Sequence, residues 1–230
     1  MAISNHWEFV DDFIGGGTFG ASASEGDSWV ITDTSSSGTP TYARVDHSES
    51  TGDYAAGVAK LQLASTSEVE NVCLNFGDKL SLDLDKVRAI EFRLKQSQAT
   101  IDSATSLSFG LSGDRNDAID SMAVQASFQC LGTNSVTVET DDGTNNNDDK
   151  STGQTLTNAY KIFKIDFANG TDDVRFYMDG GNGLTRVAAG TTFDMSNHTG
   201  GVQPFIQLQK TADTNTDGVE IDYVKVWGVR

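Results

Sequence analysis

The stretch "AIEFRLK" (residues 89–95) alternates strictly between apolar and charged side chains after its first residue. Successive side chains of a β-strand point to opposite faces, so Ile90, Phe92 and Leu94 would share one buried face. The charged residues between them would face water. This pattern predicts an antiparallel strand with one face in the core and one face solvated.

The same period of two recurs along most of the chain. It appears in 106–111 ("SLSFGL"), 122–130 ("MAVQASFQC"), 135–140 ("SVTVET"), 173–180 ("DVRFYMDG") and 205–210 ("FIQLQK"). Helical periodicity is nearly absent, and the two short polar candidates, 97–105 and 114–121, are expected to be loops with at most a single helical turn. The 23 glycines, together with many Ser, Thr, Asn and Asp residues, suit numerous short turns. The sequence therefore predicts an all-β fold of two antiparallel sheets packed face to face.

The length of 230 residues suits one sandwich domain over residues 1–230, with residues 1–20 forming an arm and the first strand. The start, "MAISNHWEFVDDFIGG", has no basic region followed by a long apolar run, and no segment approaches the ~20 apolar residues of a membrane span. Three polar segments, 15–27, 32–42 and 139–153, are expected to be loops.

Acidic residues number 33 against 16 basic residues, which gives a formal net charge of −17. Such a surface repels phosphate backbones and anionic lipids, so nucleic acid and membranes are not expected as partners. The two cysteines fall on different strand faces. Cys73 lies opposite the apolar face of "VENVCLNF" (69–76), whereas Cys130 shares its face with Phe128. Reduced, packed thiols are therefore expected more than a disulfide.

The final stretch, "VEIDYVKVWGVR" (219–230), contains two carboxylates on alternate residues, Glu220 and Asp222. Glucanases of the laminarinase and lichenase type carry Glu-x-Asp-x-(x)-Glu on such a strand. Here the position of the second glutamate is Val224 in a regular strand and Lys225 after a bulge. Because neither residue is a carboxylate, a retaining glycosidase site is not expected, and this segment is interpreted as a structural strand without catalytic residues.

The segment "VEIDYVKVW" resembles the final strand of concanavalin A-like jelly rolls, and "VRFYMDG" (174–180), "YKIFKIDFA" (160–168) and "WEFVDDF" (7–13) resemble other strands of that fold. The resemblance implies a fold shared by lectins and glucan-degrading enzymes. Sugar-binding sites combine aromatic platforms with planar polar groups. Tyr177, Gln207 and Tyr223 are the residues expected to line a carbohydrate groove.

The segment "DTNTDGVE" (213–220) has the Asp-x-Asn-x-Asp-Gly spacing of a calcium loop. Asp213, Asn215 and Asp217, assisted by Glu220, are the candidate Ca²⁺ ligands. The twelfth position of an EF-hand loop would be Val224, and no helices flank the segment, which excludes an EF-hand. An ordinary acidic hairpin turn is the simpler interpretation, and no cofactor is expected.

Three segments in order, 11–16 ("DDFIGG"), 27–46 and 65–95, resemble phage and metagenomic-virus proteins that are encoded among virion structural genes. That resemblance implies a non-enzymatic head decoration protein. It would be made in the host cytoplasm, bind the major capsid protein on the capsid exterior, and form a homo-oligomer such as a trimer. The alternative is a carbohydrate-binding or glucanase-like protein of the lectin fold. A capsid protein that binds surface glycans would combine the two functions.

Overall fold

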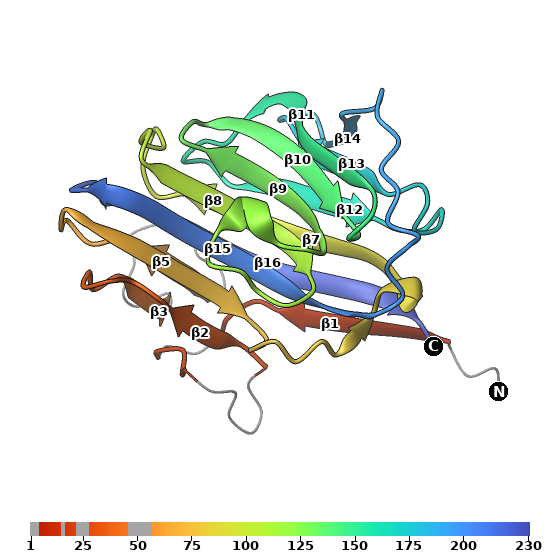
Figure 1. Ribbon diagram of the computed structural model, residues 1–230, viewed down its shortest axis with the longest axis horizontal. Coiled ribbons are helices and arrows are strands. Elements are labelled where there is room, and N and C mark those ends of the chain that lie inside the picture. Colours follow the sequence, from red (N-terminus) through yellow and green to blue (C-terminus); the bar gives the residue numbers. More distant parts are fainter. Residues whose placement is uncertain (1–4, 15–16, 22–27, 46–56) are drawn as a thin grey trace.

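The computed structural model describes residues 5–14, 17–21, 28–45 and 57–230. Within these ranges the chain forms two eight-stranded antiparallel sheets, one behind the other in Figure 1. This confirms the two-sheet antiparallel sandwich that the alternating pattern predicts. No helix in the described ranges has the length and apolar character of a membrane span.

Sheet A has the strand order β14 (Leu184–Val187), β13 (Arg175–Asp179), β12 (Lys161–Asp166), β7 (Val87–Gln96), β16 (Gly218–Val229), β4 (Val58–Gln62) and β3 (Thr41–Val45), and β1 (His6–Asp11) also pairs with β16. Sheet B has the order β11 (Asn146–Thr155), β10 (Ser135–Asp141), β9 (Gln125–Leu131), β8 (Thr105–Ser112), β15 (Gly201–Asp213), β5 (Glu68–Asn75) and β2 (Val30–Asp33), and β6 (Leu82–Asp83) also pairs with β15. Two single 3₁₀ turns, η2 (Leu84–Lys86) and η3 (Ile119–Ser121), complete the described elements.

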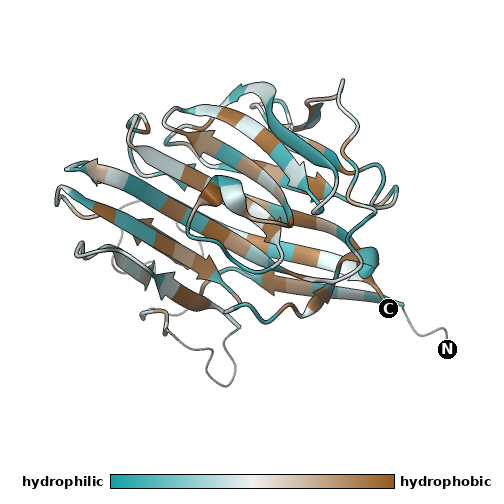
Figure 2. Cartoon of the chain, viewed as in Figure 1, coloured by the Kyte–Doolittle hydropathy of each residue, from teal (hydrophilic) through white to brown (hydrophobic). Residues whose placement is uncertain are grey.

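The core fills the space between the sheets with side chains from their inward faces. Apolar and polar residues alternate along many strands (Figure 2), as a sheet with one buried face requires. Phe109 of β8 lies at the centre: it is fully buried, and its ring contacts Phe92 and Phe163 of sheet A and Phe128 of its own sheet, with ring centroids 5.0–5.6 Å apart. These rings hold the two sheets together.

Strand β16 contains a bulge between Ile221 and Tyr223 where it pairs with β7. The bulge keeps Val224 in the core. The outer face of the strand therefore carries Glu220 before the bulge and Lys225 after it. Glu220 lies 3.2 Å from Lys95, and Asp222 forms an ion pair with Arg93. The sequence allowed either register, and the structure has the bulged one, in which a lysine follows the two carboxylates.

Two expectations about strands were wrong. Strand β9 begins at Gln125 and not at Met122, because residues 113–124 cross the outer face of sheet B before the strand starts. The acidic segment 139–153 is largely a hairpin of β10 and β11 and not a loop. An edge strand such as β11 stays solvated, so it tolerates Asn and Asp where a central strand does not.

The other segment boundaries agree with the sequence more closely. Residues 34–40 connect β2 to β3, and 114–121 contains only the turn η3, as expected. Parts of the expected arm and of the loop 15–27, namely residues 1–4, 15–16 and 22–27, lie outside the described residues. Cys73 and Cys130 are both free and fully buried, on the outer and inner faces of sheet B respectively.

Candidate functional site

The outer face of sheet B is made of amide and hydroxyl side chains. The alternation that sends Leu107, Phe109 and Leu111 inward sends small or polar residues outward on the same and neighbouring strands. The outward polar residues that are fully buried include Ser108, Ser112, Gln125, Ser127, Gln129, Gln203 and Gln207. Polar side chains at the outside of a sheet are buried only when something covers them. In Figure 1 the turn η3 and the chain around it lie across this face.

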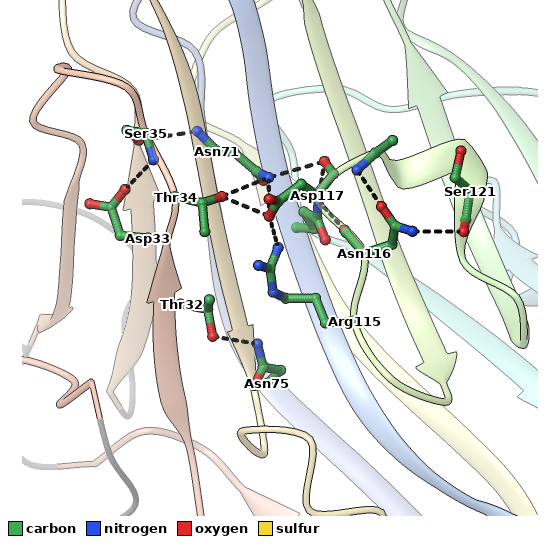
Figure 3. A network of polar contacts seen from close by, with 12 residues as sticks. Thr32, Asp33, Thr34, Ser35, Asn71, Asn75, Arg115, Asn116, Asp117 and Ser121 are labelled. Carbon is green, nitrogen blue, oxygen red and sulfur yellow. Dashed lines mark hydrogen bonds and ion pairs between the residues drawn. The ribbon is translucent and has the colours of Figure 1, made fainter.

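This covering chain, residues 113–124, is here called the strap. Its first half is held mainly by polar contacts to the sheet (Figure 3). The Gln207 side-chain amide donates to the backbone oxygens of Asn116 at 3.0 Å and Asp117 at 3.1 Å, and the Asn71 amide donates to the Asp117 backbone oxygen at 3.0 Å. The Thr34 hydroxyl donates to the Asp117 carboxylate at 2.8 Å. Asp117 therefore joins β5, the segment that follows β2, and the strap.

Asp117 is fixed although its side chain is 62% exposed. Arg115 lies 2.6 Å from its carboxylate, inside the same strap. Partial burial acts to raise the pKa of Asp117, but the hydrogen bonds from Thr34 and Arg115 prevail and hold it below its ordinary value. The carboxylate therefore stays ionised at neutral pH and keeps free acceptor capacity toward solvent.

A hollow of about 390 Å³ opens beside Asp117. Most of its accessible surface is apolar, and Val69 and Ala118 contribute to it. Its polar groups come from Thr34, Asn71, Asp117, Gln209 and Thr211. Asn71 is only 5% exposed, and its side-chain oxygen has no hydrogen-bond partner among the described residues. A buried acceptor without a donor is unfavourable. The hollow is here called the Asn71 hollow.

The three residues expected to line one sugar groove do not come together. Gln207 lies on β15 of sheet B and is buried beneath the strap, whereas Tyr177 and Tyr223 lie on the outer face of sheet A. The single-strand patterns could not show this, because they do not say which sheet a strand joins. The Tyr223 hydroxyl donates to Glu91 at 2.7 Å, and the Lys164 ammonium lies 5.6 Å from the Tyr177 ring centroid.

Asn71 and Asp117, which lie at the Asn71 hollow, were missed in the sequence. Asn71 occupies the same strand face as Cys73 in "VENVCLNF", so a polar outer face was visible there. Asp117 gave no such signal, because it lies in an irregular segment whose path over the sheet depends on tertiary contacts.

The candidate calcium ligands lie in and beside the turn between β15 and β16. The carboxylate of Asp213 accepts the backbone N–H of Asn215, and the side-chain oxygen of Asn215 accepts that of Asp217, both at 2.9 Å. Asp217 accepts the backbone N–H of Asp102 at 2.8 Å. Glu220 points from the outer face of sheet A toward Lys95. Across the described residues no group of three or more His, Cys, Asp or Glu side chains is placed to hold a metal ion.

Removing divalent cations is therefore expected to leave the protein unchanged. The side-chain oxygens of this turn already close it through backbone hydrogen bonds, as in ordinary Asx turns. The melting temperature in excess EDTA should agree within about 1 °C with that in millimolar CaCl₂, because an ion that binds only the folded state would raise it. A rise of several degrees on adding calcium would show that the turn binds the ion.

At the opposite side of the same face, Glu139 of β10 is 2% exposed. The side-chain amides of Gln125 and Gln129 donate to its two carboxylate oxygens at 2.7 and 2.5 Å. Burial, followed by the negative charges of Asp120 and Asp148, raises the pKa of Glu139 to about 7, against the lowering effect of the Gln129 hydrogen bond. Glu139 therefore changes charge near neutral pH.

This raised pKa predicts a pH-dependent stability. A carboxyl whose pKa is higher in the folded than in the unfolded state stabilises the fold when protonated, and this contribution is lost as the pH rises from about 4.5 to about 7. Glu139→Gln removes the titration, so it should gain roughly 2–3 kcal/mol relative to wild type between about pH 5 and pH 8. Urea unfolding at both pH values measures this. Asp114→Asn, an exposed acid in the strap, is the control and should show no such difference.

No protein-family model matches the chain, and no curated protein sequence matches it. Solved structures match it in fold. The Emp47p carbohydrate recognition domain has a TM-score of 0.55 at 13% identity, with 89% of this chain and 90% of that chain covered. The exoplasmic/lumenal domain of VIP36, in a form with Ca²⁺ and mannose bound, has a TM-score of 0.53 at 9% identity, covering 95% and 88%. A conserved carbohydrate esterase of the Shiga toxin-encoding bacteriophage phi24B has a TM-score of 0.50 at 19% identity, covering 96% and 100%. The fold is therefore that of the concanavalin A-like lectin domains.

Proposed function

We propose that this protein is a non-catalytic carbohydrate-binding domain whose ligand occupies the Asn71 hollow. The observation that carries the proposal is Asn71, which lines a hollow of about 390 Å³ and whose buried side-chain oxygen has no partner in the described structure. The volume lies within the range of ~300–1,000 Å³ typical of small-ligand sites. A sugar hydroxyl would supply the donor that Asn71 needs.

The rest of the lining suits a molecule that both donates and accepts hydrogen bonds. The ionised Asp117 carboxylate accepts, the Gln209 side chain does both, and the hydroxyls of Thr34 and Thr211 turn to suit. Asn71 is already hydrogen-bonded to Asp117, and Asp117 also accepts a hydrogen bond from Thr34. A hydroxylated ligand would therefore meet groups whose positions are fixed before it binds, which favours affinity.

The concanavalin A-like fold supports this proposal, because a carbohydrate recognition domain and a mannose-bound domain share it. The phage esterase raises an enzymatic alternative. Against a glucanase, the two carboxylates at the end of the chain are each held by a cation, Glu220 by Lys95 and Asp222 by Arg93. We therefore propose recognition without bond cleavage.

Gln209→Ala tests the site with little risk to the fold, since this side chain is only half-buried and lines the hollow. Loss of its hydrogen bonds to a bound sugar should weaken binding about five- to tenfold, equivalent to about 1–1.5 kcal/mol. The measurement is affinity for the best ligand from a polysaccharide and oligosaccharide panel. Gln154→Ala, a half-buried glutamine on β11, is the matched control and should bind like wild type. Equal affinity of both variants for the ligand would show that the ligand does not bind in the Asn71 hollow.

A second candidate is attachment to the exterior of a viral capsid, as a homo-oligomer that contacts the major capsid protein. It rests on the order of segments that resembles virion proteins, and a phage-encoded structure of the same fold supports it. The two functions are compatible, because a capsid-bound domain can present a glycan site to solvent. Saturable co-sedimentation with capsids of the source virus, at a fixed ratio to the major capsid protein, is the expected result. Absence of pelleting would remove this candidate and leave the carbohydrate proposal intact.

A further inference from the structure

We propose that the second half of the strap, residues 119–124, opens and uncovers a bed of amide and hydroxyl groups on the outer face of sheet B, while Asp117 keeps its place at the Asn71 hollow. An oligosaccharide extending from the Asn71 hollow would then fill this bed. The ligand part of the proposal rests on the proposed function. The opening of the strap does not, because it is a property of the protein alone.

The bed is poorly satisfied while the strap is closed. Ser108, Gln129 and Gln207 are fully buried on adjoining strands, and each has a side-chain oxygen that finds no hydrogen-bond partner in the described residues. These three unsatisfied oxygens oppose closure, and water or sugar hydroxyls would satisfy them on opening.

Few apolar contacts hold the strap down. Met122 packs on Cys73 and Phe205, and these three residues form a small cluster separate from the main core. Apart from the buried Ile119 and the half-buried Val124, residues 119–124 make hydrogen bonds within the strap, such as the one that the Asn116 side-chain amide donates to the Ser121 backbone oxygen.

Charge also opposes closure on the far side of the bed. Asp120 of η3 faces the carboxylates of Asp148 and Asp149 on β11, and it adds to the negative charge around Glu139. These like charges repel when ionised, and the strap brings Asp120 toward them. Opening relieves this repulsion without disturbing the core between the sheets.

The two free cysteines allow the opening to be measured without any ligand. Cys73 lies under Met122 in the strap cluster, whereas Cys130 lies in the main core. Both are fully buried, and burial raises the pKa of both thiols to about 12, so neither reacts while covered. Under native conditions Cys73 should be labelled by iodoacetamide at least about tenfold faster than Cys130, as mass spectrometry of the peptides would show.

Two methionine variants separate strap opening from global unfolding. Met122→Ala loosens the strap and should raise the labelling rate of Cys73 alone. Met195→Ala, at a methionine equally buried in the main core, should raise both rates together. Equal labelling rates for Cys73 and Cys130 in the wild type, rising together with denaturant, would contradict the opening of the strap. This outcome does not depend on which ligand the protein binds.

A separate measurement tests whether an oligosaccharide fills the bed. Protein labelled at Cys73 with N-ethylmaleimide carries a bulky group beside Gln207, its cross-strand partner on β15. It should lose at least about fivefold in affinity for an oligosaccharide while keeping its affinity for the corresponding monosaccharide. Unchanged oligosaccharide affinity would show that the ligand does not extend over the bed, but it would not contradict binding at the Asn71 hollow. Loss of affinity for the monosaccharide as well would also count against the bed, because the two sites would not be separable.

Discussion

Replacing Glu70 by alanine is expected to lower the free energy of unfolding by about 3–5 kcal/mol, because it leaves a lysine buried without its counter-charge. The side chains of Glu70 and Lys210 are both 0% exposed, and the ammonium lies 3.5 Å from the carboxylate. The Lys210 ammonium also donates to the backbone oxygens of Ala64, Thr66 and Asn215. The pair therefore ties two turns to the end of the sandwich.

Urea unfolding of Glu70→Ala measures this effect, and a second pair provides the control. Glu220 and Lys95 lie 3.2 Å apart on the outer face of sheet A, where both side chains keep contact with water. Glu220→Gln is expected to cost less than about 1 kcal/mol, as surface pairs usually do. A double variant, Glu70→Leu with Lys210→Met, should recover most of the loss, since it removes both buried charges. A loss below about 1 kcal/mol for Glu70→Ala would show that the pair is solvated.

Phe109→Ala is expected to cost about 3–5 kcal/mol, because it empties the centre of the core. The ring is fully buried and contacts three other phenylalanine rings, two of them across the interface between the sheets. The neighbouring side chains lie on strands that backbone hydrogen bonds hold in place, so they cannot move far into the cavity that the substitution leaves. Chemical denaturation measures the change, and Leu184→Ala, at an exposed position on the edge strand β14, should cost less than about 1 kcal/mol. A similar small cost for Phe109→Ala would mean that the core has been assigned to the wrong face.

The fold could be predicted from the sequence because each central strand carries its own evidence of burial. In β7 and β8 the alternation alone identifies the inward residues, and every one of Ile90, Phe92, Leu107 and Phe109 is buried. The alternation gave the wrong structure where a residue is buried outside the core or where a strand lies at the edge of a sheet. Met122 continues the apolar period of β9 but covers the outer face of sheet B, and β11 has polar residues on both faces because it lies at an edge.

The site could not be predicted in the same way. A strand pattern shows which residues share a face, but it does not show which sheet the strand joins, so Tyr177 and Gln207 were expected together and lie on opposite sides of the sandwich. The decisive contacts of the Asn71 hollow link residues such as Thr34 and Asp117, which are far apart in the chain and meet only in the folded protein. The calcium spacing is ambiguous for a related reason, because the same Asp and Asn spacing also closes an ordinary turn through backbone hydrogen bonds.

The most direct test of the account is an NMR titration of the ¹⁵N-labelled protein with the oligosaccharide that a panel identifies as the tightest ligand. Binding at the Asn71 hollow predicts that the largest shift changes fall on the amides of Thr34, Asn71, Gln209 and Thr211, with the outer face of sheet A unaffected. Shift changes centred on Tyr177 and Tyr223, or no saturable change with any oligosaccharide of the panel, would contradict the assignment of this protein as a carbohydrate-binding domain with its site on sheet B.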